Sequence, residues 1–429
     1  MKNPLPVTAL YLAFAVASSL VASASAATAS WTFSFPGSPA TPAPGVIALA
    51  ATDTFSAERG YGFDLATAPA ADRRPYFFSV AVPEGNYRVT VTFGDAHTAS
   101  DNTVKAESRQ LMLEHIATKP GEFLKRSFLV NVRNSHVPPP PKNAPGGSAV
   151  VLNDRETGLL RWDDKLTLEF NGPAPEIAAL TIEPAAVPTV FLAGDSTVTD
   201  QPYEPTASWG QMLPRFLQGV AVANHAESGE TMKSFISELR LAKLLSQFQA
   251  GDYLVIQFAH NDEKKSWPQT YVEAATTYKA YLRVFIAEAR LRGVTPVLVT
   301  PMQRRTFDHH GKIRNTHGSY PQAVREVAAE QHVALIDLER MSVAFYEALG
   351  PKKAPLAFNA GGRDATHQDN YGAYELAQCI VQGIRDANLP LAQHIVPDFD
   401  GFDPAHPDDP DTFQLAPSPL RSDVAPRGN

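Results

Sequence analysis

The chain has 429 residues, with 37 Lys and Arg against 45 Asp and Glu, and a formal net charge of −8 at pH 7. Because 44% of its residues are hydrophobic and only 19% are charged, it can bury substantial cores, which excludes a largely disordered protein. The length predicts two or three domains. The acidic balance excludes nucleic acid as the main partner, because neutralising phosphates requires clustered Lys and Arg.

The first 27 residues are typical of an export signal. Lys2 supplies the positive start, residues 9–21 form an apolar stretch, and small residues run to Ala27. We expect cleavage after this segment, with an uncleaved membrane anchor as the alternative. No later apolar run has the length of a membrane span. We therefore expect an exported protein, periplasmic or extracellular, with no membrane association after cleavage.

Residues 28–185 have the pattern of a β-sandwich domain. Short apolar segments alternate with Gly- and Pro-containing turns, and residues 87–93 alternate with period two, so that Tyr87, Val89, Val91 and Phe93 share one face. Evenly spaced strands without helical periodicity indicate a sandwich. The predicted strands are 75–82, 87–93, 126–132, 148–154, 165–170 and 178–184, with a rigid Pro-rich loop at 138–147.

Residues 186–397 change to strands that alternate with helices. Unbroken apolar runs indicate parallel strands that are buried on both faces, as in a doubly wound, flavodoxin-like sheet of five strands. The predicted strands are 189–194, 220–225, 253–259, 295–300 and 333–337, and the predicted helices are 208–217, 231–248, 270–293, 321–332 and 371–388. Residues 398–429 form a tail rich in Pro and Asp, which we expect to be too polar to build a core.

Chemically active residues follow the ends of these strands, which is where an open parallel sheet places its active site. The blocks are 194–200 (GDSTVTD), 224–229 (NHAESG), 260–262 (HND) and, before the last helix, 364–367 (DATH). Each block alone is more often a turn or a helix cap than a catalytic group. The order of all four, three of them at the ends of successive strands, favours catalysis.

The residue types fit acyl transfer. Ser196 is a candidate nucleophile, but a serine hydroxyl needs a base. His367 is the candidate base, and Asp364 is the candidate group that orients its imidazole. The backbone N–H groups of Ser196 and Gly229 and the side-chain amide of Asn261 are candidate donors to the developing oxyanion. This chemistry requires no metal and no organic cofactor.

The four blocks resemble those of the SGNH (GDSL-type) hydrolase superfamily, and within it the rhamnogalacturonan acetylesterases of carbohydrate esterase family 12. The resemblance extends over roughly residues 188–390, including 208–213 (SWGQML) and 364–377 (DATHQDNYGAYELA). It implies a three-layer α/β fold, the roles given above to Ser196, Asp364 and His367, and hydrolysis of acetyl esters on an acetylated pectic polysaccharide. The N-terminal domain resembles galactose-binding-like sandwiches by pattern alone.

The third block departs from the family, which has glycine where this chain has Ala259. The added methyl group calls for a small backbone adjustment. Three basic residues near the predicted site, Arg304, Arg305 and Lys264, are candidates for pairing with a galacturonate carboxylate, since Arg binds carboxylates in a bidentate manner. Their alternative role is a solvated loop or a structural ion pair.

Other functions stay open from the sequence. The same residues serve an esterase that acts on another acetylated glycan or on a galacturonate methyl ester. A metal-dependent phosphoesterase is an alternative from another class, since Asp and His are common metal ligands; its candidate ligands are Asp195, His260, Asp262, Asp364 and His367. The third possibility is a carbohydrate-binding protein with an inert hydrolase domain. The oligomeric state is not predicted.

Overall fold

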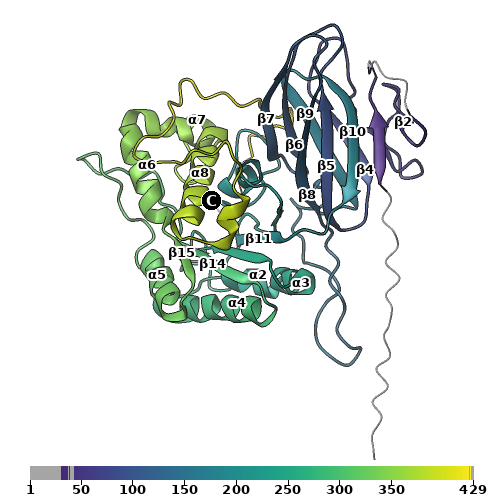
Figure 1. Ribbon diagram of the computed structural model, residues 1–429. Helices are drawn as coiled ribbons and strands as arrows, with labels where there is room; N and C mark the ends of the chain where they lie inside the picture. Colours follow the sequence, from purple (N-terminus) through teal and green to yellow (C-terminus); the bar gives the residue numbers. More distant parts are fainter. Residues whose placement is uncertain (1–29, 37, 39–42, 425, 427–429) are drawn as a thin grey trace, which may run out of the picture.

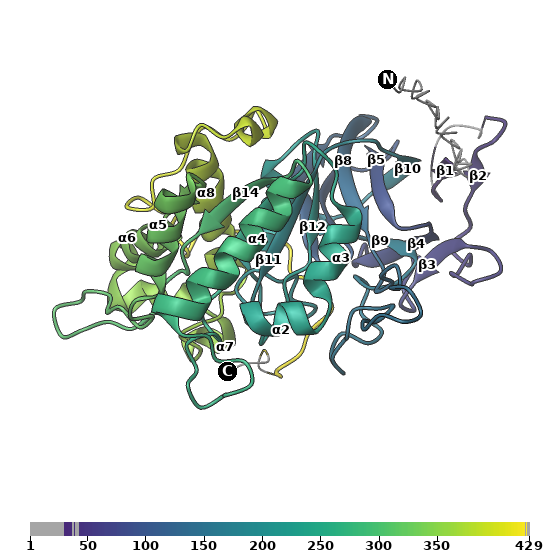
Figure 2. The same cartoon turned by 90° about the horizontal axis from the view of Figure 1, so that it is seen from below.

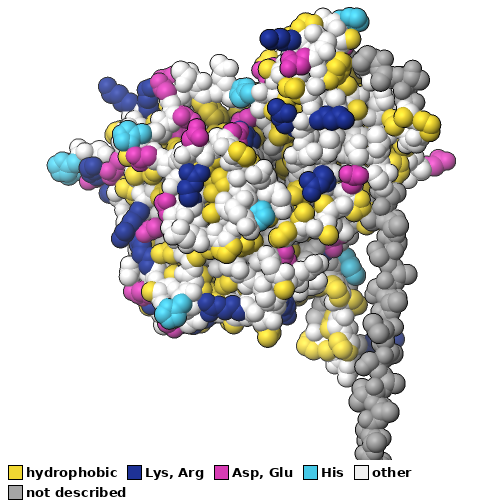
Figure 3. Space-filling model, in the orientation of Figure 1, with side chains coloured by type: hydrophobic (Ala, Val, Ile, Leu, Met, Phe, Trp, Pro, Cys, Tyr) yellow, Lys and Arg dark blue, Asp and Glu magenta, His cyan; other side chains and the backbone are white. Residues whose placement is uncertain are grey.

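The computed structural model describes residues 30–424 and 426, apart from 37 and 39–42. The expected export signal, residues 1–27, lies outside the described residues. Two parts are visible in Figure 1, a β-sandwich and an α/β unit, packed against each other. Among the described residues, no helix combines the length and the hydropathy needed to cross a bilayer. On the face drawn in Figure 3, charged side chains of both signs are interspersed.

The described part of the sandwich contains two five-stranded sheets, with the orders β2-β1-β10-β5-β8 and β3-β4-β9-β6-β7. Neighbouring strands are antiparallel except for β1 and β2. The strands are β1 (Trp31–Ser34), β2 (Ile47–Ala48), β3 (Tyr61–Asp64), β4 (Tyr76–Ala81), β5 (Gly85–Phe93), β6 (Ser100–Ala106), β7 (Gln110–Thr118), β8 (Leu124–Val132), β9 (Lys165–Ala174) and β10 (Ile177–Pro184).

The sandwich core lies between the two sheets and is rich in aromatic rings. Strand β5 shows the predicted alternation: Tyr87, Val89, Val91 and Phe93 are buried, whereas Arg88 is exposed. The predicted strand at 148–154 is wrong, since only Ala149 forms a single bridge there. The N–H of Val151 donates instead to the carbonyl of Glu238 in the α/β unit, so this apolar segment is used for docking and not for a sheet.

The α/β unit confirms the predicted doubly wound sheet. Its five strands are parallel in the order β12-β11-β13-β14-β15, which is the flavodoxin-like order. The strands are β11 (Thr189–Gly194), β12 (Ala221–Asn224), β13 (Tyr253–Gln257), β14 (Thr295–Val299) and β15 (Ala334–Ile336). The chain order reverses between β11 and β13, so the ends of these two strands flank the crevice in which such folds bind ligands.

Helices cover both faces of this sheet, in agreement with the predicted three layers. Those after β12 and β13 pack on one face, where Figure 2 shows α3 and α4, and those around α8 pack on the other. The α-helices are α1 (Trp209–Met212), α2 (Met232–Ser237), α3 (Arg240–Gln247), α4 (Lys279–Leu291), α5 (Tyr320–Gln331), α6 (Leu338–Lys353), α7 (Asn359–Gly362) and α8 (Asn370–Asp386). The 3-10 helices are η1 (Leu213–Phe216), η3 (Ala354–Ala357) and η4 (Pro390–His394), and η2 (Ala274–Tyr278) is a π-helix.

Two expectations for this region were wrong, and one helix was missed. The predicted helix 231–248 is two helices, because Leu239 adopts a left-handed conformation with φ of 64° between them. Helix α6 was not predicted at all. The tail was expected to be too polar to build a core, but Phe399 is buried in the cluster around α8. Lys105 and Asn171 of the sandwich also donate hydrogen bonds to the carbonyls of Ala416 and Pro417.

Two segments of the sandwich dock on the α/β unit, one on the loop that follows β11 and the other on α3. In the β6–β7 turn, the buried Arg109 donates to the carbonyls of Gln201 and Thr206, at 3.1 and 2.9 Å, and pairs with Glu204 at 2.6 Å. In the β8–β9 connection, Glu156 pairs with Arg240 of α3 through two hydrogen bonds of 2.6 and 3.0 Å. Both side chains of this second pair are fully buried, so the two parts share a dry, charged interface.

We predict that Glu156→Gln destabilises the whole chain. Removing one partner of a buried ion pair leaves the other charge without compensation, which costs about 3–5 kcal/mol. Unfolding in urea, followed by circular dichroism, should show this loss at pH 7. Glu183→Gln, at an exposed carboxylate in β10, should change the free energy of unfolding by less than about 1 kcal/mol; an equally small effect of Glu156→Gln would contradict the anchoring role.

His225, buried at the interface, makes the stability of the folded chain depend on pH. Its ring lies between Trp162 and Phe191, and among the described residues neither ring nitrogen has a hydrogen-bond partner. Burial, followed by nearby positive charges, lowers the pKa of His225 well below its ordinary value. The imidazole therefore stays neutral in the folded chain, whereas in the unfolded chain it takes up a proton below about pH 6.5.

We accordingly predict that acidification from pH 7.5 to 5 destabilises the wild type more than His225→Phe. The unfolded state binds the extra proton, so stability falls as the pH falls, by about 2 kcal/mol for one histidine at pH 5. Urea unfolding at both pH values measures the difference, with the exposed His310→Phe as the control. Identical pH dependence of the wild type and His225→Phe would disprove the assignment.

Candidate active site

Ser196 lies in a tight turn at the carboxyl end of β11. Gly194 makes the turn possible, because a Cβ atom there would meet Val198 and the carbonyl of Gln257 at less than 3 Å. The carboxylate of Asp195 accepts hydrogen bonds from the N–H and the hydroxyl of Thr197, at 3.0 and 2.8 Å. These contacts fix the turn, so that the Ser196 hydroxyl is held at the sheet edge.

The structure brings Ser196, His367 and Asp364 together. The Oγ atom of Ser196 lies 2.8 Å from Nε2 of His367, and Nδ1 of the same ring lies 2.9 Å from Oδ2 of Asp364. The other Asp364 oxygen accepts from the backbone N–H groups of Thr366 and His367, at 2.8 and 3.0 Å. The hydroxyl, imidazole and carboxylate thus form a continuous hydrogen-bonded chain.

The charges of these three hydrogen-bonded side chains suit proton transfer. Burial raises the pKa of Asp364, but its hydrogen bonds with His367 and Thr366 outweigh that effect and hold the pKa at about 2. The carboxylate therefore stays charged at neutral pH and can stabilise a positive imidazolium. Ser196 is 3% and His367 is 2% exposed, so the reacting atoms are largely shielded from bulk water.

The candidate oxyanion donors lie beside one another. The side-chain amide of Asn261 donates to the carbonyl of Glu230, at 3.0 Å, which ties the third block to the second. Gly229 has φ of 90°, a conformation that favours glycine. Gln201 donates to the carbonyl of Ser196 at 2.8 Å and lies 3.4 Å from the hydroxyl of Ser228. The first two blocks are therefore linked through Gln201, which the sequence analysis missed.

A second polar pair lies near the site. Nδ1 of His260 is 3.2 Å from Asp195, and its ring packs edge-on against His317 at 4.5 Å. Burial lowers the pKa of His260 to about 4, so it is neutral at pH 7. Ala259 has φ of 147°, in a region that favours glycine, which costs about 1–3 kcal/mol of strain.

The three basic candidates all have partners within the protein. Arg304 pairs with Glu263 at 2.7 Å, Arg305 donates to the carbonyls of Gly362 and Asp364, and Lys264 donates to the side chain of Asn261 at 3.0 Å. The role of structural ion pair, named above as the alternative, describes Arg304 best. A role of these side chains in binding substrate stays a prediction.

The candidate metal ligands do not gather at one point. Asp195 pairs with His260, whereas Asp364 pairs with His367, and each pair has its own hydrogen bonds. Asp262 accepts instead from the N–H of Met232, at 2.9 Å. Within the described part of the chain, no group of three or more His, Cys, Asp and Glu side chains is arranged to hold a metal ion.

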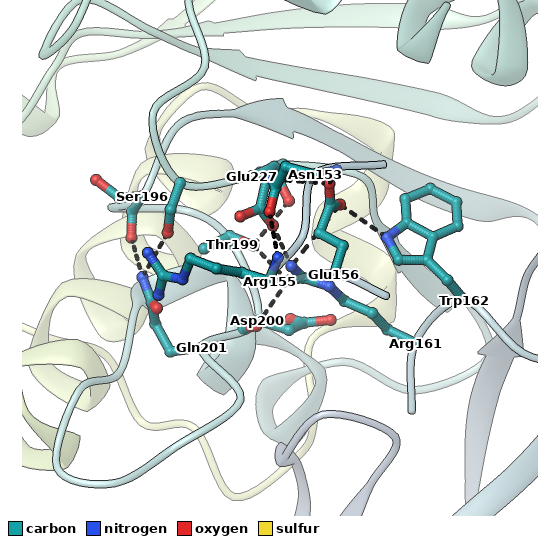
Figure 4. A network of polar contacts seen from close by, with 12 residues as sticks. Asn153, Arg155, Glu156, Arg161, Trp162, Ser196, Thr199, Asp200, Gln201 and Glu227 are labelled. Atoms are coloured by element: carbon teal, nitrogen blue, oxygen red, sulfur yellow. Dashed lines mark hydrogen bonds and ion pairs between the residues drawn. The ribbon is translucent and has the colours of Figure 1, made fainter. Parts of the chain in front are cut away.

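A segment of the sandwich, residues 153–162, borders this site and was not foreseen. Arg161 donates to the hydroxyl of Thr199 and the carbonyl of Asp200, both at 2.7 Å, and pairs with the carboxylate of Glu227 (Figure 4). Thr199 lies in the first block, 194–200, and Glu227 lies in the second, 224–229. The segment is therefore attached to both blocks, and no motif in the sequence signals it.

Comparisons with known proteins agree with this geometry. Residues 192–373 match the model of the GDSL-like Lipase/Acylhydrolase family. Rhamnogalacturonan acetylesterase RhgT of Bacillus subtilis (strain 168) is 41% identical over an alignment of 221 residues, and the match covers 48% of this chain and 94% of that protein. The chain belongs to the GDSL-like lipase/acylhydrolase family.

Two further relatives from the same organism extend the picture. The probable rhamnogalacturonan acetylesterase YesY is 38% identical over 213 residues, covering 48% of this chain and 97% of that protein. The uncharacterized esterase YxiM is 27% identical over 369 residues, 80% of this chain and 87% of that protein. This family member is thus a carboxylic ester hydrolase, and the YxiM match extends into the sandwich.

We predict that phenylmethylsulfonyl fluoride labels Ser196 of this GDSL-like hydrolase selectively. The adjacent imidazole activates this hydroxyl toward the sulfonyl group, with loss of fluoride. Peptide mass spectrometry locates the label. Ser228 is the internal control, because its contact is with Gln201, and His367→Ala should abolish labelling. A label on Ser228, or one that survives His367→Ala, would rule out activation by the imidazole.

Proposed function

We propose that this chain is an exported serine esterase that removes acetyl groups from a plant cell-wall pectic polysaccharide, rhamnogalacturonan. The observation that carries the proposal is the hydrogen-bonded chain with distances of 2.8 Å from Ser196 to His367 and 2.9 Å from His367 to Asp364. A hydroxyl in this setting becomes a nucleophile toward a carbonyl carbon. The names of RhgT and YesY support acetyl esters of rhamnogalacturonan as the substrate.

In the first half of the reaction, Oγ of Ser196 attacks the acetyl carbonyl carbon while Nε2 of His367 takes the hydroxyl proton. The negative charge that develops on the carbonyl oxygen meets the N–H groups of Ser196 and Gly229 and the amide of Asn261, each donor contributing about 3–4 kcal/mol to the barrier reduction. The intermediate then collapses, the sugar oxygen leaves, and His367 returns the proton to it. Ser196 now carries the acetyl group.

In the second half, a water molecule attacks the acetyl-enzyme. His367 removes a proton from this water, the same three donors hold the oxyanion, and Oγ of Ser196 leaves and recovers its proton from the imidazole. The charged Asp364 keeps the imidazole oriented through both halves. Acetate is the product, and none of these steps uses a cofactor.

The proposed location follows from the substrate and from residues 1–27. A plant cell-wall polysaccharide lies outside the cytoplasmic membrane, so an enzyme that acts on it must be exported. Residues 1–27 have the pattern of a cleaved export signal. The proposal therefore includes a periplasmic or extracellular enzyme.

The decisive experiment is a screen of the purified chain on acetylated rhamnogalacturonan, acetylated homogalacturonan and acetylated xylan, with acetate and methanol both quantified. We expect acetate release, highest on rhamnogalacturonan, and at least a 1,000-fold loss with Ser196→Ala, because the nucleophile is removed. The fold of Ser196→Ala, checked by its urea midpoint, should survive.

Each other result points to a different function. Methanol release would indicate a galacturonate methyl esterase, and preference for xylan would indicate another acetylated glycan. Hydrolysis of a phosphate ester, assayed beside this screen, that is lost on chelation yet survives Ser196→Ala would favour a metal-dependent phosphoesterase. Binding without product would favour an inert binding protein.

A further inference from the structure

The third block continues into a series of tight turns. The N–H of Lys264 donates to the carbonyl of Asn261 at 3.1 Å, and the N–H of Trp267 donates to the carbonyl of Lys264 at 2.8 Å. In turns with this hydrogen-bond spacing, side chains three residues apart project on the same side. Asn261, Lys264 and Trp267 therefore form a row that begins at a candidate oxyanion donor.

The ammonium group of Lys264 lies between the other two side chains. Its Nζ atom donates to Oδ1 of Asn261 at 3.0 Å and lies 4.3 Å from the centre of the Trp267 ring. The negative charge of an indole face attracts a cation in this position. Lys264 is also half-buried, so contacts on both sides hold its ammonium group next to the amide.

The contact with Lys264 helps to decide which end of the Asn261 amide faces the site. The two ends of an amide are of similar size, so hydrogen bonds select the orientation. An ammonium group can only donate and binds Oδ1, whereas the carbonyl of Glu230 can only accept and takes one hydrogen of Nδ2, at 3.0 Å. Together the two contacts clamp the amide at both ends and leave its second hydrogen for an oxyanion.

The same contact strengthens Asn261 as a donor. A positive charge at the oxygen of an amide draws electron density away from the nitrogen, because hydrogen bonds in a chain polarise one another. Asn261 is only 2% exposed, so water screens this effect little. The N–H that faces the reacting ester is therefore a better donor than that of a free amide.

We propose that Lys264 is a positioning residue of the oxyanion hole, which orients and polarises the amide of Asn261 and does not itself bind the substrate. This inference rests on the proposed function and deepens it. The ground state of an ester carries no oxyanion, so the contribution of Lys264 is made only in the transition state. It therefore acts on every ester that reaches Ser196, whether the alcohol part is acidic or neutral.

The test compares Lys264→Met with the wild type on 4-nitrophenyl acetate, acetylated xylan and acetylated rhamnogalacturonan. Methionine keeps much of the length of the side chain and removes the charge. We expect kcat and kcat/KM to fall together, roughly tenfold, on each substrate that the wild type hydrolyses, against about 100- to 1,000-fold for loss of the donor itself in Asn261→Ala. Lys264→Arg, which keeps a cationic donor, should recover part of the loss. Lys265→Met, at the exposed neighbouring lysine, should match the wild type.

A double mutant separates action through Asn261 from a general structural effect. If Lys264 acts through the amide, Lys264→Met in the Asn261→Ala background should cost less than about twofold, because the group that it orients is gone. The same tenfold loss in both backgrounds would overturn the inference, as would wild-type kcat in Lys264→Met or a loss that Lys264→Arg does not reduce.

The other outcomes separate the two proposals. A rise in KM confined to the acidic polymer would show that Lys264 binds a substrate carboxylate, which refutes the inference alone. A wild type that hydrolyses 4-nitrophenyl acetate but not acetylated rhamnogalacturonan would refute the proposed substrate, while the small ester still tests Lys264. A wild type inactive on every ester would refute both. If Lys264→Met is unstable by its urea midpoint, Lys264→Ala in the same two backgrounds decides between these outcomes.

Discussion

The parallel order of five strands is the constraint on which the site depends. All strands of a parallel sheet end at the same edge, and the order β12-β11-β13 places three consecutive strand ends next to one another. Ser196, Gly229 and Asn261 follow these ends. His367 is not on a strand end, and its carbonyl accepts from the N–H of Asn359 at 2.9 Å, which holds the last block across the crevice. The sheet therefore positions the residues of the first three blocks, and hydrogen bonds between loops position His367.

The interface between the sandwich and the α/β unit is unusual in its buried charges. Glu156 and Arg240 are fully buried, as are Arg133 and Asp200, and taking such groups out of water is costly unless each is paired. An apolar interface would hold the two parts together at less cost. The charged groups instead fix one geometry, because each must find its own partner, and that geometry places a sandwich segment beside Thr199 and Glu227.

The sequence allowed the architecture to be predicted wherever periodicity and burial coincide. Strand β5 alternates in the sequence and in the structure, and the apolar runs of the parallel strands are all present. Local patterns failed where tertiary contacts decide. Residues 148–154 contain a short apolar run, but Val151 bonds to the α/β unit and not to a strand. Leu239 breaks a helix that its neighbours favour, and Phe399 is buried despite its polar neighbours in the sequence.

In the site, too, the residues in local motifs were predicted and those placed by tertiary contacts were not. Ser196, His367 and Asp364 were foreseen as a group because their motifs stand at strand and helix ends. Gln201 and Arg161 carry no local signal, since their roles depend on contacts between residues far apart in the chain. The link from Arg161 to Glu227, for example, spans 66 positions. Such contacts become visible only in three dimensions.

The chemical character of the cleft bears on the kind of ester that fits it. Long acyl chains require an extended apolar surface, since their binding energy comes from burial of CH₂ groups. The cavity beside Gly229 is small, and Trp267 is its one large apolar lining residue among the described residues, with amide, hydroxyl and carboxylate groups around it. An aromatic face framed by hydrogen-bonding groups suits a sugar ring, which has apolar C–H faces and polar edges. Within a family whose name includes lipases, this lining favours a short acyl group on a carbohydrate over a lipid.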